Sequence, residues 1–172
     1  MNTYAKGYHY ELRNQFVKWF LENHPKDFVL YGKRWQYLEP SLSEKAKSFF
    51  QTQYKGYAQN KYATIAESKF TIAFENYRHD DYVTEKIYDA MTARSVPIYS
   101  GAPNIKDYVP TGCFIDYHQF KSMDEMYHFL TTMDETTYQS YIDCMDKFMK
   151  NPERHPNHYK NVVRTILSHI AH

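Results

Sequence analysis

The chain has 172 residues, which is enough for one domain with a buried core and short for two. Its 21 Lys and Arg residues nearly balance 20 Asp and Glu, so the formal net charge is +1. This balance argues against a surface for nucleic acid or for an acidic membrane. Aromatic residues reach 18% of the chain. Because no basic stripe accompanies them, they indicate core packing rather than base stacking, and we expect no nucleic-acid partner.

The two cysteines, Cys113 and Cys144, fall in a predicted strand and a predicted helix. The N-terminal residues lack the apolar core of a secretory signal, so we expect both cysteines to be reduced, packed thiols. No apolar run of about 18 residues is present that would span a membrane. These features predict a cytoplasmic protein, peripheral to the inner face of a membrane at most, or one part of a longer chain.

The first half of the chain alternates between helical and extended patterns. In chain order, the predicted elements are a helix over 9–24, a strand over 28–31, helices over 43–52 and 60–68, and a strand over 70–74. Ser43 is placed to serve as the N-cap of the helix over 43–52. Pro25 follows the first helix directly, where a helix is expected to end.

The second half continues the alternation. We expect Asp80 or Asp81 to cap a helix whose apolar face carries Val83, Ile87, Ala90 and Met91. The further predicted elements are strands over 96–99 and 113–116 and helices over 122–132, 135–149 and 158–170. Pro97 is expected at the start of its strand, because proline donates no hydrogen bond to a sheet. The pattern predicts an α/β protein, a single Rossmann-like domain over residues 1–172 with a parallel sheet flanked by helices.

Residues 74–88 place a polar loop between a short apolar strand and an amphipathic helix, where open α/β sheets bind ligands. Lys86 lies near the positive end of that helix, so it either binds an anion or pairs with Asp89. Glu85 either complements the helix dipole or accepts hydrogen bonds from a ribose diol. Asn76 is either a turn residue or a ligand-binding residue at the end of the strand.

Three stretches carry a resemblance to one family. Residues 69–76 (KFTIAFEN) and 81–87 (DYVTEKI) resemble the donor-binding signature of α1,3/α1,4-fucosyltransferases. Residues 96–103 (VPIYSGAP) resemble the next strand and turn of that family. Looser similarity at Arg13-Asn14, 29–33 and 54–57 extends the match over roughly residues 9–120.

The resemblance implies the donor-binding, C-terminal half of a GT-B glycosyltransferase that uses GDP-β-L-fucose. By matching positions, Arg13 and Lys86 would hold the pyrophosphate and Glu85 the ribose, while Asn76 and Tyr82 would line the fucose and phosphate side. Fixed cations would stabilise the departing GDP, a role that a metal plays in other transferases, so no metal or other cofactor is expected. The implied reaction is inverting transfer of L-fucose to a hydroxyl of an oligosaccharide or lipopolysaccharide acceptor.

The general base of this family lies on an acceptor-binding domain that has no counterpart in this sequence, so the catalytic residue stays unassigned. Three explanations follow: a part of a two-domain enzyme, a half-enzyme completed by another chain or by a second copy of itself, or a non-catalytic GDP-sugar-binding or interaction module. Animal relatives carry a membrane anchor and work in the Golgi lumen, which is the expected location if this chain is part of such an enzyme.

Overall fold

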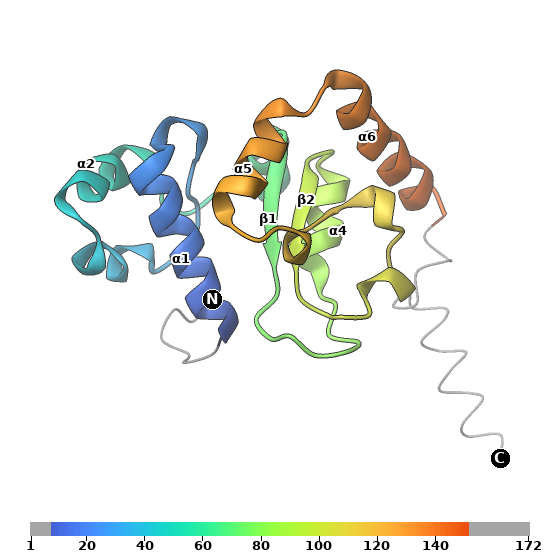
Figure 1. Ribbon diagram of the computed structural model, residues 1–172, viewed down its shortest axis with the longest axis horizontal. Coiled ribbons are helices and arrows are strands. Elements are labelled where there is room, and N and C mark those ends of the chain that lie inside the picture. The colour runs from blue at the N-terminus through green and yellow to red at the C-terminus, as the bar shows by residue number, and fades with distance from the viewer. Residues whose placement is uncertain (1–7, 152–172) are drawn as a thin grey trace, which may run out of the picture.

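A computed structural model describes residues 8–151 of the chain. Its centre is a three-stranded parallel sheet in the order β1-β2-β3. The strands are β1 (Phe70–Phe74), β2 (Val96–Ser100) and β3 (Ile115–Asp116). This confirms the predicted α/β class with a parallel sheet flanked by helices (Figure 1). The predicted helix over 158–170 lies outside the described residues.

The helices match the predicted ones within a few residues, except at the start of α4. They are α1 (Tyr8–Asn23), α2 (Glu44–Gln53), α3 (Lys61–Ala66), α4 (Glu85–Thr92), α5 (Met123–Thr132) and α6 (Glu135–Met149). Ser43 is confirmed as the N-cap of α2, because its side chain accepts a hydrogen bond of 3.1 Å from the backbone N–H of Ala46. Among residues 8–151, no helix is both long and apolar enough to cross a membrane.

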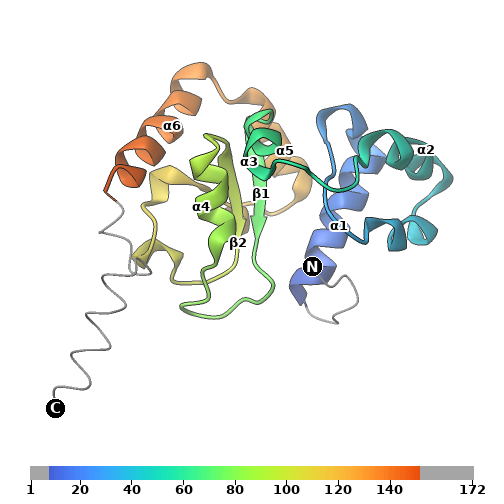
Figure 2. The ribbon, with the colours of Figure 1, turned by 180° about the vertical axis from the view of Figure 1, so that it is seen from behind.

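The sheet separates two apolar layers because successive side chains of a strand point to opposite faces. Ala73 and Tyr99 pack with helices α4 and α6 in one core cluster. Phe74 and Ile98 pack with α1 and α5 in another. Figures 1 and 2, seen from opposite sides, show α4 on one face of the sheet and α5 on the other. Both faces are covered, as parallel sheets require.

The predicted strand over 28–31 is wrong. This segment makes only an isolated parallel bridge between Leu30 and Tyr54. The backbone N–H of Leu30 donates to the carbonyl of Gln53 at 2.9 Å, and the N–H of Lys55 donates to the carbonyl of Leu30 at 2.8 Å. The segment therefore pairs with the chain that leaves α2, and Leu30 packs in a separate cluster with α1 and α2. Its apolar run reflects that small core rather than a place in the sheet.

The remaining strand predictions are close to the structure. Pro97 is the second residue of β2, next to the expected position. The last strand is shorter than predicted, because Cys113 belongs to a 3-10 turn over Thr111–Cys113 and only Ile115–Asp116 pair with β2.

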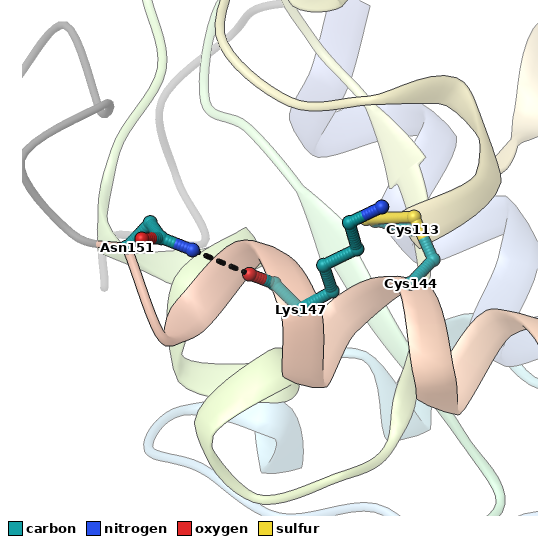
Figure 3. The surroundings of a disulfide bond; sticks show 4 residues. All are labelled: Cys113, Cys144, Lys147 and Asn151. Atoms are coloured by element: carbon teal, nitrogen blue, oxygen red, sulfur yellow. Dashed lines mark hydrogen bonds between the residues drawn. A yellow bond between two sulfur atoms is a disulfide. The ribbon is translucent and has the colours of Figure 1, made fainter.

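The prediction of reduced cysteines is wrong, since Cys113 and Cys144 form a disulfide (Figure 3). The two residues are 31 positions apart in sequence, but the turn over Thr111–Cys113 packs against α6 and brings their Cα atoms to 5.2 Å. That separation lies within the range that a disulfide bridges. Disulfides persist in oxidising compartments, so the cysteines no longer support the predicted cytoplasmic location. That location stays a prediction.

Candidate functional site at the carboxyl end of strand β1

Arg13 on α1 reaches the end of β1 across 61 positions of sequence. Its Nη2 atom donates to the carbonyl oxygens of Phe74 at 3.1 Å and Glu75 at 3.2 Å, and to Oδ1 of Asn76 at 3.1 Å. Burial lowers the pKa of the Arg13 guanidinium, and the nearby Tyr10 and Glu75 oppose that shift. An arginine stays charged in proteins, so α1 brings a nearly buried positive charge to this edge of the sheet.

Lys86 brings a second cation to the same place from the first turn of α4. Its Nζ donates to Oε2 of Glu75 at 2.9 Å and to Oγ1 of Thr84 at 2.8 Å. The alternative in which Lys86 pairs with Asp89 is wrong, because Asp89 faces α3 and bonds there to Lys61 and the Tyr62 hydroxyl. Lys86 thus has an anionic partner in the folded chain, and that partner is Glu75.

Glu75 is the residue that sequence reasoning missed. It follows β1 directly and is completely buried. Its Oε1 accepts a hydrogen bond of 2.8 Å from the backbone N–H of Thr84, the residue that precedes α4 and makes no side-chain cap of its own. Glu75 therefore caps α4 from a different element and adds a negative charge at the positive end of the helix. An acid directly after a buried strand was the available signal.

The other predicted site residues lie on the segment between β1 and α4. Asn76 joins the cluster through its bond to Arg13. Tyr82 is half-buried, with its ring edge-on to Tyr77 at a centroid distance of 5.8 Å. Glu85 is the exposed first residue of α4. The structure thus brings Arg13, Asn76 and Lys86 together around residues 74–76, with Tyr82 and Glu85 close by in sequence.

The expected capping of α4 by Asp80 or Asp81 is wrong. Asp81 has a left-handed backbone with φ of 65°. Its Oδ1 accepts hydrogen bonds from Nδ2 of Asn104 at 2.8 Å and from the Tyr108 hydroxyl at 2.7 Å. These bonds, that of Tyr108 foremost, hold the pKa of Asp81 below its usual range, and the pKa of Tyr108 rises to about 12. Asp81 therefore links the loop between β1 and α4 to the segment after β2 through these hydrogen bonds.

Two further polar groups at this edge escaped sequence reasoning. Ser100 ends β2, accepts the backbone N–H of Glu75 at 2.8 Å through its carbonyl, and shares a hydrogen bond of 3.1 Å between its hydroxyl and Nε2 of His118. Burial, and then the charge of Arg78, lower the pKa of His118, which favours the neutral ring. Within residues 8–151, no group of three or more His, Cys, Asp or Glu side chains gathers in a way that could hold a metal ion.

The structure is thus an α/β domain whose parallel sheet has two cationic side chains, Arg13 and Lys86, at its carboxyl edge. The family described as "Glycosyltransferase family 10 (fucosyltransferase) C-term" matches residues 11–166. The match covers most of the chain, so the protein belongs to glycosyltransferase family 10, the fucosyltransferases, through the C-terminal part of that family.

Individual relatives agree with this assignment. The chain is 37% identical over 100 residues to the 4-galactosyl-N-acetylglucosaminide 3-alpha-L-fucosyltransferase 9 of Mus musculus, covering 56% of this chain and 28% of that protein. It is 37% identical over 87 residues to the alpha-(1,3)-fucosyltransferase 7 of Homo sapiens, covering 49% of this chain and 25% of that protein. The chain thus matches about a quarter of the length of these relatives.

Solved structures give the same fold. A crystal structure of an alpha1,3-fucosyltransferase with GDP-fucose aligns with a TM-score of 0.50 and 21% identity, covering 78% of this chain and 44% of that one. At this level of identity the likeness establishes the fold and leaves the roles of single residues to the geometry described above.

Proposed function

We propose that this chain is the donor-binding domain of an α1,3-fucosyltransferase and that it binds GDP-fucose at the carboxyl end of β1. The observation that carries the proposal is the convergence of Arg13 and Lys86, from two different helices, on residues 74–76. Family membership and a relative whose structure is described with GDP-fucose support the choice of ligand.

The chemistry follows from charge. When the bond between fucose and the diphosphate breaks, negative charge grows on the GDP leaving group, and fixed cations stabilise that charge. Arg13 and Lys86 would supply the cations, without a metal. Glu85, exposed at the start of α4, would accept hydrogen bonds from the ribose, while Asn76 and Tyr82 would line the fucose and phosphate side.

Inverting transfer also needs a general base and an acceptor. We propose that the acceptor is a glycan hydroxyl, on an oligosaccharide or on a lipopolysaccharide. The base would come from an acceptor-binding domain, located either elsewhere in a longer chain or on a separate subunit. The alternative is a module that binds a GDP-sugar and performs no transfer.

Calorimetric titration of the purified chain with GDP, GDP-fucose and UDP, in the presence of a chelator, tests the proposal. We expect GDP and GDP-fucose to bind and UDP to bind more weakly. A folded chain that binds none of them, or binds UDP equally well, contradicts the assignment as a GDP-sugar domain. Incubation with GDP-fucose and glycan acceptors then separates the two alternatives, because only a transferase releases GDP in step with a fucosylated product.

A further inference from the structure

Glu75 is the most deeply buried charged group at the candidate site. Its exposed fraction is 0%, and a buried carboxylate needs hydrogen-bond partners to remain ionised. The two oxygens have different partners: Oε1 takes the backbone N–H of Thr84 at 2.8 Å, and Oε2 takes Nζ of Lys86 at 2.9 Å. The Thr84 hydroxyl lies within 3.0 Å of Oε1 and 2.7 Å of Oε2. The carboxylate thus joins the start of α4 to the lysine.

The place of Glu75 is fixed by packing as well as by hydrogen bonds. Its backbone N–H donates to the carbonyl of Ser100 at 2.8 Å, which extends the pairing of β1 with β2 by one residue. A Cβ atom on Gly101 would lie 2.6 Å from Cγ of Glu75 and would also collide with the Tyr99 hydroxyl. The absence of a side chain at position 101 therefore leaves the space that the Glu75 side chain occupies.

Lys86 needs such a partner. It lies in the first turn of α4, whose unpaired backbone N–H groups repel a positive side chain. The Lys86 side chain keeps an exposed fraction of 13%, whereas that of Glu75 is 0%. The part of this ion pair that solvent reaches therefore belongs to the Lys86 side chain, and the Glu75 carboxylate lies behind it.

We infer that Glu75 is a positioning residue, which acts on the donor through Lys86 by holding its Nζ atom where the diphosphate of a nucleotide-sugar binds. The inference rests on the proposed function and deepens it. With an exposed fraction of 0%, Glu75 is not placed to touch the donor itself. It overcomes the repulsion between Lys86 and the helix end and fixes the lysine before the donor arrives.

The variant Glu75→Gln isolates this role. A glutamine has one acceptor oxygen, while the two oxygens of Glu75 face two sets of donors. The backbone N–H of Thr84 is fixed by the helix, so the glutamine oxygen should take that bond and keep the cap. The amide NH₂ then faces Nζ of Lys86, and two donors repel each other. We therefore expect the variant to stay folded and to displace the lysine.

Amine labelling with mass spectrometry tests the positioning without any ligand. In the wild type, Lys86 should react slowly with an acetylating reagent, compared with the exposed Lys106 in the same sample. In Glu75→Gln, Lys86 should react several-fold faster while Lys106 is unchanged. The matched control is Asp89→Asn, which removes another buried carboxylate that contacts Lys61 rather than Lys86. Equal Lys86 labelling in wild type and Glu75→Gln, or the same increase in Asp89→Asn, overturns the inference.

A double-mutant cycle on GDP affinity tests the link to the donor. Lys86→Met should weaken GDP binding roughly 10- to 100-fold, the effect of losing one charge-assisted hydrogen bond. Glu75→Gln should weaken it several-fold alone, but should change it by no more than about twofold when position 86 is already Met. Circular dichroism and thermal melting measure the folded fraction of each variant, and each affinity is referred to that fraction.

The outcomes separate the two proposals. Additive losses in the cycle mean that Glu75 acts through the fold and overturn the inference, while the proposed function stands. A wild-type chain that binds no GDP contradicts the proposed function, and with it the role of Glu75 toward the donor. The labelling result still decides in that case whether Glu75 positions Lys86.

Discussion

Two ion pairs at helix α4 differ in how far they are withdrawn from water. At its start, Glu75 pairs with Lys86, and the side chains have exposed fractions of 0% and 13%. On its flank, Asp89 pairs with Lys61, and the fractions are 11% and 53%. An ion pair in contact with water contributes little to stability, whereas breaking a buried pair leaves an uncompensated charge. A pair of a carboxylate and a lysine therefore has different consequences at the start of this helix and on its flank.

Access to water sharpens this contrast. Asp89 keeps a hydrogen bond of 2.9 Å from the Tyr62 hydroxyl if Lys61 is lost, and its cationic partner is half in solvent. Glu75 also keeps hydrogen bonds from uncharged donors if Lys86 is lost, but it has no access to water. We therefore expect the pair at the candidate site to matter for folding as well as for ligand binding, and the pair on the flank to matter little for either.

The largest effect is expected from Lys86→Met. Removing the ion-pair partner of the buried Glu75 should lower the free energy of unfolding by about 3–5 kcal/mol. Urea denaturation of wild type and variant at neutral pH measures it. The double variant Glu75→Gln/Lys86→Met should recover a large part of the loss, because no buried charge is left unpaired. If Lys86→Met lowers the free energy of unfolding by less than about 1 kcal/mol, the pair contributes no more than an ion pair on the surface.

This expectation changes how a loss of activity at position 86 is interpreted. In a transferase that contains this domain, Lys86→Ala should reduce turnover of GDP-fucose by roughly 10²- to 10³-fold, as the loss of one preorganised charge-stabilising group does. Part of such a loss could come from unfolding alone. Activity must therefore be normalised to the folded fraction, and unchanged activity in a folded variant would remove Lys86 from the site.

Removing the disulfide tests how much this covalent link adds to the free energy of unfolding. Because Cys113 and Cys144 are 31 positions apart in sequence, the entropy of loop closure predicts a stabilisation of roughly 3.5 kcal/mol. The variant Cys113→Ala/Cys144→Ala should lose about that much in urea denaturation, and reductant should bring the wild type toward the same midpoint. Titration of free thiols in the denatured, unreduced chain provides the control. Two titratable thiols per chain would contradict the disulfide.

Lys61→Met is the counterpart of Lys86→Met and should have a small effect. Because the Lys61 side chain is 53% exposed, solvent screens its charge, and the loss of unfolding free energy should stay below about 1 kcal/mol. The two variants are compared in the same urea series. Similar losses in both would mean that burial does not distinguish the two pairs, and the comparison would fail.

The smallest effect is expected at Asp81, and it depends on pH. The folded chain lowers the pKa of Asp81, so its contribution to stability is present above the ordinary aspartate pKa of about 3.9. It is lost as the pH falls through the lowered pKa. Asp81→Asn tolerates the left-handed backbone but lacks the charge. The stability gap between wild type and variant should therefore close in acid, and a gap that is constant with pH would exclude this linkage.

Local sequence patterns predicted correctly those helices and strands whose type does not depend on which other elements they pack against. The strand Phe70–Phe74 and the helix Glu135–Met149 agree with the predicted bounds, because apolar runs and helical spacing are local signals. The segment over 28–31 shows the limit of that approach. Its apolar residues fit a buried strand, but they pack with α1 and α2 instead, and nothing local distinguishes the two surroundings.

At the candidate site, too, some features followed from the sequence and others only from the packing of the chain. The sequence offered Lys86 either an anion or Asp89, and the family resemblance implied a role for Arg13 toward the donor, but Glu75 was left without a role. The spacing of three residues made Asp89 one of two possible partners, whereas the carboxylate that contacts the ammonium group lies 11 positions away. Long-range contacts of this kind depend on how β1 and α4 are placed against each other.

The sequence by itself determined the fold class, the family and the residues that carry charge at the end of β1, because these depend on residue types and on short-range order. Only the tertiary structure decided the disulfide between Cys113 and Cys144, the hydrogen bond between Asp81 and Tyr108, and the pairing of Glu75 with Lys86. Each of these joins segments that are separated along the chain. Their energies depend on burial and on distances of a few ångströms, which are set when the helices pack against the sheet.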